Sequence, residues 1–377
     1  MKTLLLVAGS RSGSDFFQSL LDGHPQVLQF PGTIRTNKKL IEILSSHDPL
    51  TISSYFIKNY IHFFDSRLGW SQKVERHNML GKNKNQYYIV NQEEFKKNFY
   101  NLFKKNSTDV FENKIYKSIL FLHQAYAITC GQNISIKKIM LINSHLVKYT
   151  KYFGNKIKNI DFDIIHTIRN PLSGISSPVS NWLNYEEGKN FFANSLYFQL
   201  NLLVNGVKEL EKVKKNNNKF FFIIQLEKLH QNHGGVLKDF CKKYDLKYDT
   251  CLEKATFFNL EWWGDKISGK DLNGINKNFE ISFKKNFFYE KDITFFEYIL
   301  ADYINFYNYK FTKEKKIFFF KILPLKCEIL VWKNTLKHKR IKHILSIPFF
   351  YLKRIVFINK FYQKKIKMPY SFGTKIQ

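Results

Sequence analysis

The chain has 377 residues, of which 44% are hydrophobic and 24% charged, so it is long enough for one large α/β domain with additions or for two domains. Its formal net charge of +29 is typical of proteins that bind nucleic acid or an anionic membrane. The excess is nearly all Lys, in a chain rich in Asn, Ile, Phe and Tyr, so A/T-rich codon usage explains it equally well.

The chain has four cysteines, Cys130, Cys241, Cys251 and Cys327, and none of them forms a CxxC pair. Their spacing therefore excludes a cysteine zinc site and a disulfide framework. No segment approaches the roughly 20 uninterrupted apolar residues of a membrane span. The apolar run at the N-terminus is too short for a signal peptide and leads directly into a polar loop. We therefore expect a cytoplasmic protein without a metal.

The first predicted elements are a strand, a loop and a helix. Thr3 to Ala8 form an apolar run bounded by Gly9, which predicts a buried parallel strand. Apolar residues between positions 16 and 21 have helical spacing, and Gly23 ends that helix, with His24 in the closing turn. A second short strand is predicted at Gln26–Phe30.

The loop between the first strand and helix has the form of an anion site. A Gly/Ser turn that opens a helix offers backbone N–H groups to an anion, and the helix dipole strengthens their pull. Arg11 can supply the charge that a lysine supplies in nucleotide-hydrolysing P-loops, and Ser12 and Ser14 add hydroxyl donors. The GxxxxGK[ST] pattern of those enzymes is absent. By itself the loop fits a structural turn equally well.

The rest of the chain predicts an α/β fold with an insertion and a tail. Residues 36–132 are helical and aromatic, which favours a cap or acceptor-binding insertion. "FDIIHTIRNP" and "KFFFIIQLEKL" predict two further buried strands separated by helices. This pattern predicts a three-layer P-loop-type parallel sheet with helices on both faces. We divide the chain into a domain at 1–312 and a basic, aromatic, helical C-terminal extension at 313–377.

A second candidate anchor follows the strand that ends at Arg169. Asn170 can cap the next helix, and Pro171 suits its first turn. An Arg at a strand end and Ser177, two turns into the helix, could converge on one phosphate. Taken alone, the turn is equally a helix start with a solvated arginine.

"SRSGSDFFQSLLDGHPQV" resembles the RSGTT-type loop of sulfotransferases, especially their Golgi-type and tyrosylprotein members. That family binds 3′-phosphoadenosine 5′-phosphosulfate (PAPS), and the resemblance implies PAPS as co-substrate here. The resemblance makes Arg11 the loop cation and places Phe16 against adenine. It also implies that the phosphosulfate is contacted by Ser12, Gly13 and Ser14. Asp15 departs from the family's Thr or Ser, and its carboxylate should repel an anion unless it turns away to cap the helix.

The second anchor also resembles this family, which holds the 3′-phosphate with an R-[DN]-P-x5-S element that Arg169 and Ser177 match. "IIQLEKL" resembles the family's strand that ends in an acid, here Glu227. "EKDITFFEYILADYINFYNY" resembles its closing helix. The resemblance spans about residues 1–309 and is faint between 34 and 137.

His145 in "MLINSHLVKY" is the candidate general base. Cytosolic sulfotransferases carry a catalytic His in a similar "THLP" element, whereas Golgi-type members use a Glu after the HP turn, where this chain has no acid. A histidine that only makes a hydrogen bond remains the alternative. "WWGDKISGKDLNGINK" loosely resembles a loop that grips the 3′-phosphate and offers Lys266, Lys270 and Gly274; a plain surface loop is the simpler interpretation.

The leading hypothesis is a sulfotransferase that moves a sulfuryl group from PAPS to a hydroxyl of a glycan or glycolipid, by in-line transfer with a general base. The alternatives are a P-loop kinase or NTPase, and a non-enzymatic basic peripheral membrane protein. Aromatic clusters between basic residues in the extension fit an anionic membrane at its inner face, or a helical extension that packs on the main domain. No signature of nucleic-acid binding is present.

Overall fold

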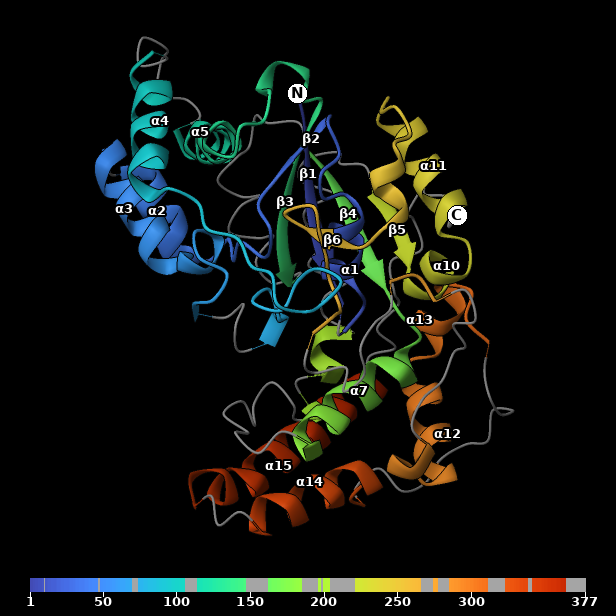
Figure 1. Cartoon of the computed structure of the whole chain (residues 1–377). Coiled ribbons are helices and arrows are strands. Elements are labelled where there is room, and N and C mark those ends of the chain that lie inside the picture. Colours follow the sequence, from blue (N-terminus) through green and yellow to red (C-terminus); the bar gives the residue numbers. More distant parts are fainter. Residues whose placement is uncertain are drawn as a thin grey trace.

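A computed structural model of the chain describes residues 1–9, 11–46, 48–69, 74–105, 114–146, 162–184, 196–197, 199–203, 221–265, 274–276, 285–310, 323–337 and 341–363. Its centre is a five-stranded sheet, and helices gather around the sheet and at one end of it (Figure 1). All four strand pairings within this sheet are parallel, with the spatial order β2-β3-β1-β4-β5. The strands are β1 (Lys2–Ala8), β2 (Val27–Gln29), β3 (Ile139–Leu146), β4 (Phe162–Ile168) and β5 (Phe221–Gln225).

The four strands predicted from apolar runs are confirmed within two residues at each end. Strand β3, which lies between β2 and β1, is the one that the sequence analysis did not single out. Its apolar first half ends in Asn143, Ser144 and His145, so it lacks the uninterrupted apolar run that marks its neighbours. A small antiparallel hairpin, β6 (Thr256–Phe257) and β7 (Leu260–Glu261), stands apart from this sheet.

One face of the sheet is covered by three helices: α1 (Ser14–Leu20), α10 (Leu226–Gln231) and α11 (His233–Lys243). Phe222 on β5 meets the ring of Phe240 on α11 at 5.8 Å between ring centroids. Phe17 of α1 meets the same ring at 5.3 Å. These fully or nearly buried aromatic side chains join strand and helices into one core.

The opposite face is covered by α5 (Lys114–Thr129) and α13 (Ala301–Phe306), whereas α7 (Pro171–Asn184) lies beyond the carboxyl end of β4 (Figure 1). His166 on β4 meets the ring of Tyr307, which follows α13, at 6.3 Å. Ile223, its register partner on β5, shares a core with the apolar side chains of α7. On β1, the hydroxyl of Thr3 donates a hydrogen bond to the hydroxyl of Tyr116 on α5 at 3.3 Å. The predicted three-layer α/β fold is therefore confirmed.

The chain order places a topological switch at the carboxyl ends of β1 and β4. These strands are neighbours, but β3 and β2 lie on the far side of β1 and β5 lies on the far side of β4, so the strand order reverses between them. In open parallel sheets, such a switch leaves a crevice beyond the strand ends where ligands bind. The two sequence motifs, after β1 and after β4, therefore border one crevice.

The predicted helical insertion folds into four helices and joins the core of the sheet: α2 (Lys38–Ser46), α3 (Pro49–Asn59), α4 (Gln92–Lys105) and α5. Phe30, just after β2, stacks on Phe63 and meets Phe56 and Tyr126, so the insertion is not a detached cap. Short 3-10 turns lie at Ile61–Phe63, Ile134–Ile136, Thr250–Glu253 and Lys285–Phe287.

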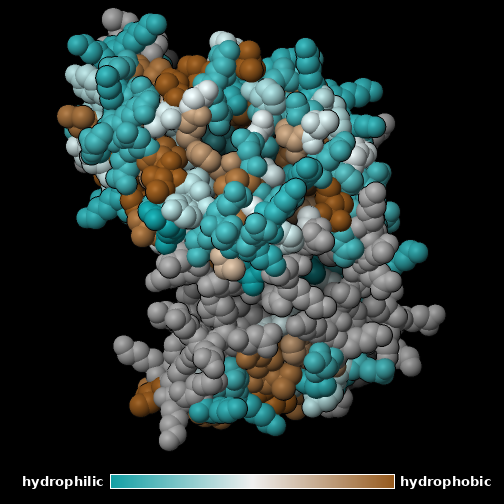
Figure 2. All heavy atoms as spheres, viewed as in Figure 1, coloured by the Kyte–Doolittle hydropathy of each residue, from teal (hydrophilic) through white to brown (hydrophobic). Residues whose placement is uncertain are grey.

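The predicted closing helix is present as α12 (Glu290–Ile299) and α13, and the C-terminal extension is helical, with α14 (Lys326–Lys337) and α15 (Ile341–Gln363). Cys327 and Val331 of α14 and Ile358 of α15 are buried in the core that also holds α7 and α13. Figure 2 shows a hydrophobic patch at this end of the molecule, beside hydrophilic groups. No helix in the described ranges is long and apolar enough to cross a bilayer.

Candidate active site

The loop after β1 is held by contacts that explain its sequence. Gly13 has φ +82°, and an added Cβ would collide with the side chain of Leu226, so both conformation and space require glycine. The hydroxyl of Ser12 is buried and donates to the carbonyl oxygen of Thr167 on β4 at 2.7 Å. Ser12 therefore fastens the loop to β4, and only its backbone is left to face an anion.

Arg11 lies in this loop with φ +50°, a left-handed conformation that is uncommon for a residue with a side chain. Its Nη1 donates to Asp265 Oδ2 at 2.9 Å and its Nε to Ser177 Oγ at 3.3 Å. Burial lowers the pKa of Arg11, but the charge and hydrogen bond of Asp265 more than offset this and hold the pKa above its usual value. The guanidinium is therefore a fixed, permanent charge.

The second anchor forms as the sequence predicts. Asn170 Oδ1 accepts from the backbone N–H groups of Leu172 and Ser173 at 3.1 and 3.2 Å, so it caps α7. The N–H of Asn170 donates to Glu227 Oε1 at 2.8 Å, and Tyr309 donates to Oε2 at 3.0 Å. The predicted strand-ending acid thus holds the turn that carries Arg169.

The two anchors meet. Arg169 Nη1 lies 3.5 Å from the carbonyl oxygen of Arg11, and Arg11 Nε contacts Ser177, two turns into α7. Residues 158 and 166 positions apart in the chain are thereby gathered at the crevice between β1 and β4. Two guanidinium groups and a serine hydroxyl at one sheet edge make a strongly positive site.

Arg169 has an unfilled bonding capacity. Its Nε is buried and makes no hydrogen bond among the described residues. Burial lowers the pKa of Arg169; Glu227 opposes this shift, and the charge of Arg11 adds to it. A buried N–H donor without an acceptor costs about 1–3 kcal/mol, and more when charged. An anion in the crevice would relieve the repulsion between the two arginines.

His145 occupies an unusual backbone position at the end of β3. In the pairing with β1, Leu6 is opposite Asn143 and Val7 is opposite His145. Ser144 is therefore an extra residue on β3, as in a β-bulge. His145 has φ +61°, and its N–H donates to Asn143 Oδ1 at 3.0 Å. Bulges re-aim side chains next to active sites. This one brings His145 over the N-terminus of α1.

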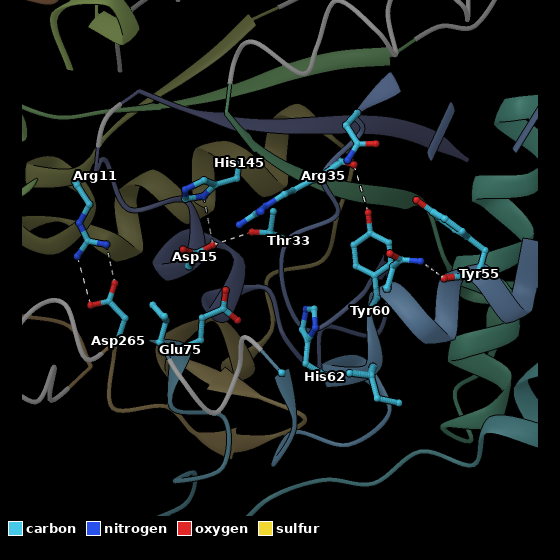
Figure 3. A pocket seen from close by; sticks show the side chains of 15 residues that line it. Arg11, Asp15, Thr33, Arg35, Tyr55, Tyr60, His62, Glu75, His145 and Asp265 are labelled. Carbon is cyan, nitrogen blue, oxygen red and sulfur yellow. Dashed lines mark hydrogen bonds and ion pairs between the residues drawn. The ribbon is translucent and has the colours of Figure 1, made fainter. Parts of the chain in front are cut away.

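The imidazole of His145 lies beside Ser14 and Asp15 in the first turn of α1, and Figure 3 shows it next to Asp15. Its Nδ1 is 3.1 Å from Ser14 Oγ and 3.9 Å from Asp15 Oδ1. Burial lowers the pKa of His145; the Asp15 charge opposes this shift, whereas Arg11 and Arg35 reinforce it. The net direction is downward, so the neutral imidazole prevails at pH 7 and can accept a proton.

Asp15 stands in the first turn of α1, as the sequence analysis suggested, but its carboxylate accepts hydrogen bonds from side chains outside the helix. The helix has no side-chain cap, and Asp15 Oδ1 instead accepts from Asn143 Nδ2 at 3.1 Å and Thr33 Oγ1 at 3.5 Å. The carboxylate thus turns from the loop amides toward His145 and a cavity. This geometry reduces the repulsion that a carboxylate would exert on an anion held by the loop.

The cavity that these residues border has a volume of about 370 Å³ and opens between the loop and the insertion. In Figure 3, Arg11 and Asp265 stand at one end, Asp15 and His145 lie near the middle, and Tyr55, Tyr60 and His62 line the other end. Charged and polar groups from several elements therefore converge on one space. The lining residues that the sequence analysis did not name include Arg35, Tyr55, Tyr60, His62, Glu75 and Asp265.

Only one of these omissions carried a signal in the sequence. Arg35 follows β2, so it lies at the same carboxyl edge of the sheet as the other site residues, where a ligand-binding side chain is expected. Glu75 and Tyr60 come from segments without a motif, and Asp265 stands in "WWGDKISGKDLNGINK", where the resemblance pointed to the lysines and Gly274 and gave the acid no role. Tertiary packing alone brings them to the cavity.

Phe16, assigned to adenine by the resemblance, is buried and stacks on His230 of α10 with ring centroids 4.3 Å apart. One face of the ring is therefore covered by an imidazole. The backbone N–H of Asn276 lies 3.4 Å from His230 Nδ1, so the described segment that includes Gly274 lies beside α10. Lys266 and Lys270 lie outside the described residues.

His24 has the structural role that was expected. Its Nε2 lies 2.9 Å from the carbonyl oxygen of Lys247, and its Nδ1 accepts from the N–H of Gln26, so it fixes the turn after α1. Within the described ranges, no group of three or more His, Cys, Asp or Glu side chains could hold a metal ion.

Comparisons with known proteins give distant likenesses of fold. No protein-family model matches the chain, and no curated protein matches it significantly. Among solved structures, the sulfotransferase domain of the Synechococcus PCC 7002 olefin synthase is 11% identical, covers 75% of this chain and 84% of its own, and has a TM-score of 0.38. The sulfotransferase domain of the curacin biosynthetic pathway is 10% identical, with coverages of 90% and 98% and a TM-score of 0.36.

A third solved structure, the sulfotransferase STF9 from Mycobacterium avium, is 10% identical, with coverages of 83% and 79% and a TM-score of 0.38. TM-scores this low do not assign a function.

Proposed function

We propose that the protein is a sulfotransferase that moves a sulfuryl group from PAPS to a hydroxyl group of a carbohydrate or glycolipid acceptor. The carrying observation is that the buried Arg169 Nε makes no hydrogen bond among the described residues, while Nη1 of the same side chain lies 3.5 Å from the carbonyl oxygen of Arg11, whose Nε contacts Ser177. A site that gathers two arginines at a sheet edge is built for a ligand with more than one anionic group.

The residues present fit the donor that the motif resemblance implies. Arg169 and Ser177 would hold the 3′-phosphate, and Arg11 with the amides of the loop would hold the 5′-phosphosulfate. Arg11 now pairs with Asp265, so an incoming anion must take over part of that hydrogen bonding. The donor supplies the sulfuryl group, and the fixed charge of Arg11 would stabilise the negative charge that grows on the departing phosphate.

His145 is the residue best placed to take the acceptor proton. Ser14 contacts Nδ1, so a tautomer with the proton on Nδ1 donates to Ser14 and leaves the Nε2 lone pair to act as base. Asp15 near Nδ1 would stabilise the imidazolium that results. The bulge and the positive φ hold the ring in this place.

The cavity suits an acceptor that carries several hydroxyl groups. A hydroxyl both donates and accepts hydrogen bonds, so its recognition calls for both kinds of partner. The lining offers acceptors on Glu75 and Asp15, amide groups on Asn37 and Asn59, and aromatic rings on Tyr55 and Tyr60. Because His145 also lines this cavity, an acceptor bound there would have its hydroxyl near the base.

Calorimetric titration with adenosine 3′,5′-bisphosphate and with adenosine 5′-monophosphate tests the proposal. Arg169→Ala should weaken binding of the bisphosphate by about tenfold or more, since one bidentate phosphate contact is worth roughly 1.5–3 kcal/mol. It should leave binding of the monophosphate nearly unchanged, because that ligand lacks the phosphate assigned to Arg169. Arg11→Ala should weaken both ligands.

Arg67→Ala is the matched control, since Arg67 is exposed and pairs with Asp65 outside the cavity. It should leave both affinities unchanged. Equal affinity of the wild type and Arg169→Ala for the bisphosphate would contradict the proposal. Magnesium-dependent turnover of ATP without release of sulfate from PAPS would favour the kinase alternative instead.

A further inference from the structure

Helix α15 in the C-terminal extension presents an apolar stripe to the surface. Five of its side chains are each more than half exposed: Ile341, Leu345, Phe349, Leu352 and Val356. Their spacings of four, four, three and four residues confine them to an arc of about 80° on a helix with 3.6 residues per turn. We call these five residues the α15 stripe. The hydrophobic patch at this end of the molecule in Figure 2 lies where Figure 1 draws α14 and α15.

The stripe is not the face by which α15 packs on the protein. Phe350, Arg354 and Ile358 are buried, and their positions lie roughly opposite the stripe on the helix. Arg354 Nε pairs with Glu328 of α14 at 2.6 Å, which fixes the rotation of α15. The helix therefore has two apolar faces, of which one is already used.

The charge around the stripe has one sign. Between Ile341 and Gln363 the sequence has no Asp or Glu and three lysines, Lys342, Lys353 and Lys360. Spacings of 11 and 7 residues align these positions along one edge of the stripe. Lys353 is exposed, and its Nζ lies 4.1 Å from the centre of the Phe349 ring, so at least one positive charge borders the apolar surface directly.

We propose that the α15 stripe seats the protein on the surface of an anionic lipid bilayer, with the helix parallel to the membrane. An amphipathic helix of this kind buries its apolar arc at the boundary of headgroups and acyl chains, while adjoining lysines pair with anionic headgroups. A second copy of the chain fits less well, because pairing two such helices would set lysines against lysines with no acid to balance them.

Flotation of the full-length protein with vesicles tests this inference. The protein should float with vesicles of phosphatidylcholine mixed with phosphatidylserine, and bind vesicles of phosphatidylcholine alone at least about tenfold more weakly. Leu345→Gln combined with Leu352→Gln should lower partitioning to the anionic vesicles by about tenfold or more, since two leucines leave the interface.

The matched control is Leu50→Gln combined with Ile89→Gln, which removes two apolar side chains that are also more than half exposed and lie far from α15 in sequence. It should bind anionic vesicles as the wild type does, and both variants should keep the wild-type circular dichroism. Absence of vesicle binding, equal binding to both kinds of vesicle, or unchanged binding by the stripe variant would overturn the inference. A dimer in sedimentation that only the stripe variant abolishes would also overturn it, in favour of a second copy.

Discussion

The site at the sheet edge and the C-terminal helices are both basic, but they hold their charges differently. At the sheet edge, Arg11 and Arg169 are held by Asp265, Ser177 and backbone carbonyl groups within a crevice. On α15, Lys353 is exposed and flanks an apolar stripe. A fixed, partly desolvated charge selects a ligand by geometry, whereas exposed charges act as a sum that salt weakens.

This difference shows that a net charge of +29 does not describe one property of the molecule. The two regions should respond independently to substitution. Changes at the sheet edge should alter nucleotide binding and transfer but leave vesicle binding intact, and changes in the stripe should do the reverse. The predictions below test this separation.

The largest effect is expected for His145→Asn. Asparagine tolerates a positive φ and can still contact Ser14, but it cannot accept the proton. The rate of PAPS conversion in the presence of hydroxyl acceptors should fall about 10²–10⁴-fold, while the affinity for adenosine 3′,5′-bisphosphate stays within about twofold. A variant that keeps its rate would show that another group is the base.

The pH profile of the wild type sharpens this prediction. Because the pKa of His145 is lowered by burial, the basic form persists below the usual value for histidine, near 6.5. The rate should therefore rise with pH with a midpoint below about pH 6.5 and then level off. A profile that still rises above pH 8 would contradict an unprotonated His145 as base.

The next largest effect is expected for Arg354→Met, which leaves Glu328 buried without its partner. Glu328 already has a raised pKa because of burial, although Arg354 opposes that shift. Loss of the cation should lower the free energy of unfolding by about 3 kcal/mol, measured by denaturant titration. Adding Glu328→Gln should restore most of the loss. Affinity for the adenine nucleotide should not change, since this arginine is structural.

The third effect in size is expected for Gly13→Ala, for which Gly131→Ala is the control. Both glycines have positive φ, at +82° and +71°, but only Gly13 lacks space for a Cβ. Gly131→Ala should cost about 1 kcal/mol of stability. Gly13→Ala should cost more and should also weaken nucleotide binding by distorting the loop, as calorimetry would show. Equal costs, with nucleotide affinity retained, would mean that the loop does not hold the anion.

The smallest effect is expected for Asp265→Asn. The carboxylate holds Arg11 at 2.9 Å and competes with an incoming anion for it. The Asp265→Asn variant should bind adenosine 3′,5′-bisphosphate roughly three- to tenfold more tightly, because the competing ion pair is worth about 1 kcal/mol. Weaker binding would show that Asp265 mainly positions Arg11.

Much of the fold could be predicted because its signals are local. Apolar runs mark β1, β4 and β5, since strands buried on both faces contain few polar residues. Asn170 predicts the start of α7, because its side chain caps the helix through hydrogen bonds with residues only two and three positions away. Strand β3 was not singled out, because the polar residues Asn143, Ser144 and His145 break its apolar run.

The site divides in the same way. The sequence by itself determined Arg11, the glycine loop, Arg169 and Ser177, since each belongs to a short motif whose spacing has a physical meaning. Only the tertiary structure decided that Arg11 contacts Ser177 and Asp265, that a bulge turns His145 toward Ser14, and that α15 leaves one apolar face uncovered. The physical reason is that such contacts join residues up to 254 positions apart, and no local pattern encodes which distant groups will meet when layers pack.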